Sequence, residues 1–297
     1  MRGAVPFAIF FLCRVLLAQA VPLPIHGTPS LFAEVVGKGG VATVVIHGGP
    51  GLAHTYLRPE WDAMAGTGRV VYYDQRGCGR SSLELPIGWR QDLQDLDRVV
   101  SAADPTGHQV VLAASSWGTR LALLYAHFHP SRVRGLILSG LPPWPRGAKY
   151  ARVGYSAAEN AHLDSLEAGI SVRATPPADS ARELAGNPLA GPVLAGRLAR
   201  AGPCLDIGRA EMDSWFDLPA IESLTVVAPI LVMRGTHAIP YELQNRVPGD
   251  GWIELSAVMP NAHVAEFADA AHDPWFESSH EFFAKALSFV RSLTEHK

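Results

Sequence analysis

Short apolar runs rich in β-branched residues alternate with amphipathic stretches along most of this chain. Runs of this length predict buried strands, and apolar residues three or four positions apart predict helices. We predict strands over residues 31–36, 41–46, 69–73, 109–114, 133–138, 229–234 and 263–267. We predict helices over residues 57–65, 90–103, 117–128 and 279–293. This alternation is typical of an α/β fold, in which a mostly parallel sheet is covered by helices on both faces.

The alternation is interrupted by a long stretch, residues 142–224, that is rich in Ala, Gly and Pro. Strand and helix patterns resume after it. We therefore expect residues 21–141 and 225–297 to form one core, with residues 142–224 inserted as a cap.

The first twenty residues have the features of a signal peptide. Arg2 precedes an apolar stretch over residues 4–12, and Ala18 and Ala20 have the small-x-small form of a cleavage site. Cleavage after Ala20 would remove no predicted strand, so we expect a secreted or periplasmic protein. It would be cytoplasmic if this segment is not a signal peptide. The uncharged run is shorter than the roughly 20 residues of a membrane helix, so we expect no stable membrane insertion.

Composition agrees with one sizeable catalytic domain. The chain has 297 residues, 48% of them hydrophobic, and a net charge of −3. Charge is near balance and no run of Lys or Arg occurs, which argues against a nucleic-acid partner. Cys13, Cys78 and Cys204 lack zinc-type spacing. Pairing of Cys78 with Cys204 stays open, although we favour a free thiol at Cys78.

Ser116 is the first candidate catalytic residue. It lies in the sequence ASSWG at residues 114–118, between an apolar strand run and an apolar helix pattern. The pattern small-x-Ser-x-Gly is typical of a nucleophile elbow, a strained turn that holds a serine hydroxyl clear of the sheet. The alternative is an ordinary serine that caps the start of a helix.

Two further motifs favour catalysis. The glycine turn HGGPG at residues 47–51 follows a predicted strand and places backbone N–H groups at its carboxyl end. Acyl transfer needs such donors because negative charge grows on the carbonyl oxygen, and we predict an oxyanion hole formed by the amides of Gly49 and Trp117. His272 follows the last predicted strand and is our candidate general base for Ser116, in the hydrolase order of serine first and histidine last.

These motifs resemble the proline iminopeptidases, which are α/β-hydrolase serine peptidases of the prolyl aminopeptidase type. The resemblance rests on HGGPG at residues 47–51, DQRGCGRS at residues 74–81 and SSWGT at residues 115–119. It covers about residues 31–140 and resumes from about residue 224.

The resemblance implies an α/β-hydrolase fold with a helical cap inserted between strands 6 and 7 of the family, here the runs over residues 133–138 and 229–234. It also implies hydrolysis at the amino end of small peptides, with no metal or organic cofactor. Asp74 would be a structural residue that braces loops beside the active site.

The chain departs from the family pattern at the acid of the triad. That acid should follow the glycine at the end of strand 7, Gly235, by three residues, but the position holds Ala238. Alanine cannot accept the hydrogen bond that orients the imidazole and stabilises the imidazolium. Glu242 is a substitute within the same loop, and Asp273 is a weaker one because adjacent side chains orient poorly for this role. The chain is an engineered variant, takes its acid from elsewhere, or has lost its chemistry.

The cap is expected to set substrate specificity. An aminopeptidase must hold a charged α-amino group, which favours a carboxylate in a partly dry pocket. Glu211 and Asp213 are the candidates for this role, and Trp215 beside them offers a ring for a proline-like side chain. The alternative for each acid is a solvated surface charge.

The sequence thus favours a serine hydrolase that acts through an acyl-enzyme on a small peptide and releases N-terminal proline or another small residue. Its activity would be impaired if Ala238 leaves the triad incomplete. Two alternatives stay open. One is an esterase or lactonase that acts on small esters, and the other is a catalytically weak, hydrolase-like binding protein.

Overall fold

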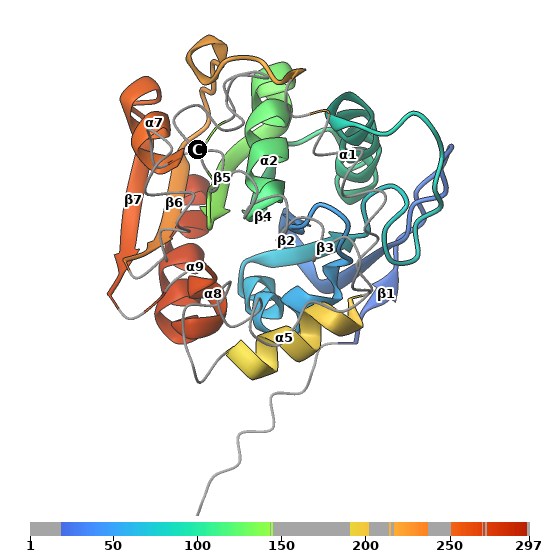
Figure 1. Cartoon of the computed structure of the whole chain (residues 1–297), viewed down its shortest axis with the longest axis horizontal. Coiled ribbons are helices and arrows are strands. Elements are labelled where there is room, and N and C mark those ends of the chain that lie inside the picture. Colours follow the sequence, from blue (N-terminus) through green and yellow to red (C-terminus); the bar gives the residue numbers. More distant parts are fainter. Residues whose placement is uncertain are drawn as a thin grey trace, which may run out of the picture.

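A parallel sheet forms the centre of the computed structural model (Figure 1). The structure describes residues 19–142, 144, 191–201, 214, 217–236, 251–268, 270 and 272–295. Neighbouring strands pair in parallel in the order β2 (Ala33–Ile46), β4 (Val110–Ser115), β5 (Val133–Ser139), β6 (Ile230–Gly235) and β7 (Ala262–Phe267). The predicted strands are confirmed, and with them the α/β class of the fold.

The runs predicted as strands over residues 31–36 and 41–46 are two arms of β2. Strand β3 (Gly68–Tyr73) pairs with both arms, and the short strand β1 (Val21–Pro22) pairs with the first arm. The bend between the arms requires glycine. A Cβ on Gly40 would lie 2.2 Å from the carbonyl oxygen of Thr67, and its φ of +56° is in the left-handed region.

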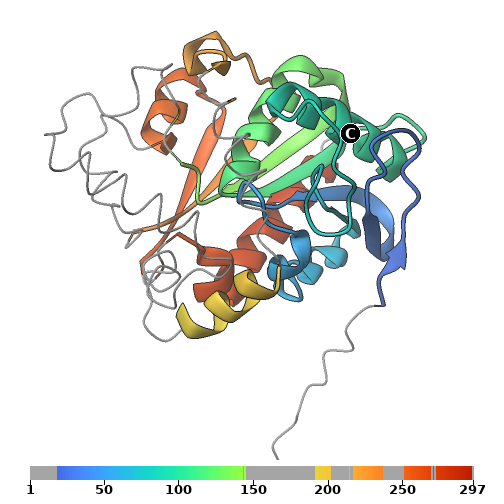
Figure 2. The same cartoon turned by 45° about the vertical axis from the view of Figure 1, so that its right-hand side comes forward.

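The central strands are apolar on both faces, because helices cover both. Along β4, Leu112 and Ala114 belong to one buried cluster, and Val111 and Ala113 belong to the other. The first face is covered by α1 (Trp89–Ala103), α2 (Trp117–Phe128) and α7 (Gly251–Val258), and the opposite face by α5 (Gly191–Arg200), α8 (Pro274–Glu277) and α9 (Ser279–Glu295) (Figures 1 and 2). Short 3₁₀ helices η3 (Pro130–Arg132) and η6 (Ile221–Ser223) lie in the connections.

The helix predicted over residues 57–65 is wrong. The structure has two 3₁₀ helices there, η1 (His54–Leu57) and η2 (Glu60–Gly66). Pro59 separates them, because it lacks an N–H group and disfavours helical backbone at the residue before it. Arg58 is accordingly extended, with φ of −94° and ψ of 149°.

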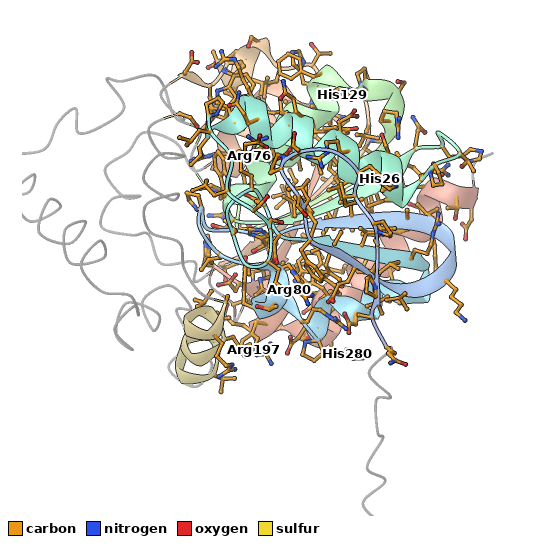
Figure 3. All side chains as sticks on the ribbon, turned by 90° about the vertical axis from the view of Figure 1, so that its right-hand side faces the viewer. His26, Arg76, Arg80, His129, Arg197 and His280 are labelled. Atoms are coloured by element: carbon orange, nitrogen blue, oxygen red, sulfur yellow. The ribbon has the colours of Figure 1, made fainter. Side chains whose placement is uncertain are left out.

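Only parts of the inserted stretch and of the chain ends are described. Helix α5 packs its buried Leu194 against the core, and Arg197 pairs with Glu60 of η2 at 2.5 Å (Figure 3). The indole N–H of Trp144 donates to the carbonyl of Pro219 at 2.9 Å. The expected signal segment lies almost wholly outside the described residues, as do Cys13 and Cys204. Within the described residues, no helix combines the length and apolar character needed to cross a membrane.

Candidate active site

The candidate residues follow the carboxyl ends of neighbouring strands. HGGPG at residues 47–51 comes after β2, Ser116 after β4, Gly140 after β5, and His272 lies in the loop after β7. Because the strands are parallel and adjacent, these ends meet at one edge of the sheet, which is where open α/β sheets carry their sites.

Ser116 lies at a strained turn between β4 and α2. Its φ of 51° and ψ of −122° make it the one non-glycine residue with positive φ in the described part of the chain. Its N–H donates to the carbonyl of Ser139 in β5 at 2.8 Å, which ties the turn to the next strand. Strain of this kind persists only where the surrounding structure enforces it, and it is typical of functional sites.

Close backbone packing explains the glycine of the SSWG pattern. A Cβ on Gly118 would lie 2.5 Å from the carbonyl oxygen of Ile46 and 2.7 Å from that of His47. The first turn of α2 therefore presses on the end of β2, and no larger residue fits at position 118. This contact sets the HGGPG turn beside the serine.

His47 fixes the HGGPG turn from within. Its Nδ1 lies 2.8 Å from the carbonyl oxygen of Gly48, and its Nε2 accepts the backbone N–H of Gln75 at 3.0 Å. Burial lowers the pKa of His47 to about 4, so the ring is neutral with its proton on Nδ1. His47 therefore donates to Gly48 and holds the peptide that links Gly48 to Gly49.

The other candidate backbone donor begins a helix. Trp117 is the first residue of α2, where N–H groups have no partner within the helix, and its indole is buried. Gly49 has φ of +133°, a conformation that glycine adopts readily. Trp117 thus follows Ser116 directly, and Gly49 follows Gly48, whose backbone packs closely against the Ser116 side chain.

His272 packs against the end of β5. A Cβ on Gly140 would lie 3.1 Å from Cε1 and 3.3 Å from Nδ1 of His272, so glycine makes room for the imidazole. Gly140 follows Ser139, whose carbonyl accepts the N–H of Ser116. The fold therefore brings the loops of Ser116 and His272 together across a single strand end.

Asp273 is buried next to His272 and bonds to another side chain. One of its carboxylate oxygens accepts the indole N–H of Trp275 at 2.8 Å. Burial raises the pKa of Asp273, although the charge of His272 and the bond from Trp275 act in the opposite direction. The carboxylate is thus already bonded to an indole, and within the described residues it makes no hydrogen bond to the His272 ring, which makes it a poor triad acid.

The remaining predicted residues cannot be placed. The triad-acid position Ala238, its substitute Glu242 and the substrate-binding candidates Glu211, Asp213 and Trp215 lie outside the described residues.

A buried charge network lies beside this edge and includes Asp74, for which a structural role was expected. Oδ1 of Asp74 lies 2.7 Å from Nδ1 of His54, and Oε1 of Glu34 lies 3.2 Å from its Nε2. Arg58 pairs with Glu34 at 2.5 Å, and the backbone N–H of Arg80 donates to Asp74 at 2.9 Å. We call Glu34, His54, Arg58 and Asp74 the brace, since they join β2, η1 and the loop after β3.

Both nitrogens of His54 face carboxylates, which favours the imidazolium. Burial lowers the pKa of His54, but the hydrogen bonds and charges of Asp74 and Glu34 outweigh it, and the net pKa is raised above its ordinary value. The same contacts lower the pKa of Glu34 and Asp74. The brace therefore favours one cationic ring between two anions.

We expect His54→Gln to lower the free energy of unfolding by about 3 kcal/mol near pH 6, the scale of breaking a buried ion pair. A histidine whose folded-state pKa is raised stabilises the fold fully below its unfolded pKa of about 6.5, and this stabilisation is lost as pH rises through the folded pKa. The difference between wild type and variant should therefore shrink as pH rises.

Urea unfolding at several pH values between about 6 and 8.5 measures this difference. His280→Gln, at an exposed histidine of α9 (Figure 3), is the control, and we expect it to change stability little. A stability difference that grows with pH would contradict a charged His54.

Sequence motifs did not mark His47, His54, Glu34 or Tyr56 as functional residues. His47 lies inside the HGGPG motif, but only the glycines of that motif suggested a role. The others contact residues far away in the sequence, and no local spacing marks them.

Comparison with known proteins agrees with this geometry. Residues 43–286 match the model of a family described as the alpha/beta hydrolase family. A curated proline iminopeptidase of Lactiplantibacillus plantarum is 36% identical over 127 residues, which are 39% of this chain and 42% of that protein. The match thus spans about two fifths of the relative's length.

Solved structures show the same fold over almost the whole chain. A thermophilic esterase from Thermogutta terrifontis superposes with a TM-score of 0.70 at 19% identity, covering 93% of this chain and 99% of that one. A proline iminopeptidase from Mycobacterium smegmatis superposes with a TM-score of 0.64 at 22% identity, covering 93% of this chain and 98% of that one. The resemblance to proline iminopeptidases is therefore supported by the sequence match to curated members, and the solved structures show the shared fold.

Proposed function

Since the chain belongs to the alpha/beta hydrolase family, we propose that it is a serine hydrolase whose nucleophile is Ser116. The observation that carries this proposal is the positive φ of Ser116 at the turn from β4 to α2. A serine used only for packing or capping has no need of such a conformation, whereas a nucleophile elbow does.

The proposed mechanism gives each residue one role. His272 takes the proton of the Ser116 hydroxyl as it attacks the substrate carbonyl. The N–H groups of Gly49 and Trp117 stabilise the negative charge that forms on the carbonyl oxygen. His272 then protonates the leaving group, and water hydrolyses the acyl-enzyme by the same steps.

We propose a peptide substrate from which the enzyme releases N-terminal proline or another small residue. The support is the family resemblance of three motifs and the partial match to curated proline iminopeptidases. A site of this kind must pair the free α-amino group, and Glu211 and Asp213 are our candidates for that contact.

Free and N-acetylated arylamides of proline and alanine test this substrate class. A site built to pair an ammonium group leaves its carboxylate unpaired when the amine is acetylated. We expect kcat/KM for the free amines to exceed that for the blocked ones by about tenfold or more. Equal values would contradict an aminopeptidase.

The second candidate is an esterase or lactonase, and Ala238 favours it. An imidazole without an acid partner is a weaker base and stabilises its cation less. Esters have better leaving groups than amides, so their hydrolysis depends less on proton transfer from the histidine. Small acyl esters turned over faster than any free aminoacyl arylamide would support this candidate.

A further inference from the structure

The hydroxyl of Tyr56 lies where the three loops of the proposed active site meet. Tyr56 belongs to η1, is only 3% exposed and packs its ring edge on Trp275, with 6.0 Å between ring centroids. Sequence motifs did not single it out, and the mechanism proposed above does not use it.

The first of these loops is the HGGPG turn. The Tyr56 hydroxyl accepts the backbone N–H of Gly48 at 2.8 Å. The carbonyl of Gly48 is held by His47 at 2.8 Å. Gly48 is thus fixed at both of its backbone polar groups: Tyr56 holds the peptide that links it to His47, and His47 holds the peptide that links it to Gly49. Within this planar trans peptide, the N–H of Gly49 points in the opposite direction to the Gly48 carbonyl, so holding the carbonyl also orients the N–H.

The second loop is the nucleophile elbow. A Cβ built on Gly48 would lie 2.8 Å from the Tyr56 hydroxyl and 3.0 Å from the Cβ of Ser116. Tyr56 and Ser116 therefore flank Gly48 closely. The buried Ser115 hydroxyl also lies close to the phenol, where it opposes part of the rise that burial causes in the pKa of Tyr56.

The third loop carries His272. The ring of Tyr56 contacts Trp275, whose indole N–H holds Asp273, the neighbour of His272. Burial, and after it the charge of Asp273, raises the pKa of Tyr56. The phenol therefore stays protonated at any pH at which the enzyme would work, and its oxygen remains a neutral acceptor for Gly48.

We infer that Tyr56 is a positioning residue that aligns the oxyanion hole by fixing the backbone at Gly48, the residue before Gly49. This inference rests on the proposed function of Ser116. It predicts that the hydroxyl acts on the transition state, in which the oxyanion exists, and not on ground-state binding of the substrate.

Tyr56→Phe tests the inference because it keeps the ring packing and removes only the hydroxyl. Loss of one oxyanion donor lowers kcat by about 10²- to 10³-fold. A donor that is present but misaligned should lower kcat by a smaller factor. We expect kcat and the rate of Ser116 labelling by a fluorophosphonate to fall by about 10- to 100-fold, with KM changed by less than about twofold.

Tyr125→Phe is the matched control. Tyr125 is fully buried, and its hydroxyl donates to Asp97 at 2.8 Å in the last turns of α2, far along that helix from Ser116. This variant loses a comparable hydroxyl, so we expect a similar loss of thermal stability with the labelling rate unchanged. Equal losses of labelling rate in both variants would assign the effect to general loosening and would overturn the inference.

Hydrogen exchange measures the same contact without any activity. We expect the backbone segment at residues 47–51 to exchange faster in Tyr56→Phe than in wild type or Tyr125→Phe, because the Gly48 N–H loses its acceptor. Unchanged exchange there, or an unchanged labelling rate, would overturn the role of Tyr56. Failure of the wild-type protein to label would instead contradict the proposed function, and the exchange result would still decide the contact.

Discussion

Ser116→Ala should lose all covalent labelling by a fluorophosphonate and lower kcat on the best substrate by about 10²-fold. In triad enzymes, removing the serine lowers kcat by about 10⁶-fold and removing the acid lowers it by about 10⁴-fold. These losses are not additive, because the triad residues act as one unit. On the proposed mechanism, a chain with alanine at the triad-acid position 238 would already have lost most of what the serine contributes. About 10²-fold remains to be lost.

Ser131→Ala provides the control for that experiment. Ser131 is exposed in η3, which precedes β5 and so lies at the amino edge of the parallel strands, away from Ser116. We expect this variant to keep the wild-type labelling and turnover. Labelling that persists in Ser116→Ala, at an equal rate, would refute the assignment of the nucleophile.

Ala238→Asp should raise kcat by about 10³- to 10⁴-fold, the largest gain that we expect from any single change. The aspartate would accept the Nδ1–H of His272, fix its tautomer and stabilise the imidazolium during attack. Position 238 follows Gly235, the last residue of β6, by three residues, which is where the family resemblance places the acid. Steady-state kinetics on the same substrate measures the gain.

Ala238→Asn separates charge from shape. Asparagine has nearly the shape of aspartate but carries no charge. Replacing the aspartate of a complete triad by asparagine lowers kcat by about 10⁴-fold, so we expect Ala238→Asn to raise kcat little. In the Ala238→Asp background, the further change Ser116→Ala should lower kcat by about 10⁶-fold, because catalysis by a complete triad depends fully on the serine.

Glu242→Gln decides where any existing acid comes from. If Glu242 already supplies the acid, this variant loses activity and Ala238→Asp gains none. If neither variant changes the rate, and labelling of Ser116 is absent, the hydrolase-like binding protein is the better description. Asp273 is a poor substitute in either case, because it is buried, bonded to Trp275 and has a raised pKa.

The strands could be predicted from the sequence because both faces of the sheet are covered. A strand that is buried on both sides reads as a continuous β-branched run, and Val110–Ser115 and Val133–Ser139 show this pattern clearly. The region around Pro59 was less readable, because its amphipathic spacing fits an α-helix while the proline divides it into two 3₁₀ helices.

The active-site turn could also be predicted, because its constraints are local. The small residues around Ser116 and the glycines of residues 47–51 are needed by the backbone itself, so they appear as a fixed pattern in the sequence. The side chains that hold these turns could not be predicted in this way, because their partners lie far away in the sequence. Gln75 donates to His47 across 28 positions, and Asp74 reaches His54 across 20.

The sequence by itself determined the strand runs, the strained serine turn, the glycine turn and the identities of the candidate catalytic residues, because each depends on the sterics of neighbouring residues. Only the tertiary structure decided that Gly48 packs against Ser116 and binds Tyr56, and that Gly140 packs against His272. It also decided that His54 lies between two carboxylates. Those contacts depend on the order of strands in the sheet, which no short stretch of sequence contains.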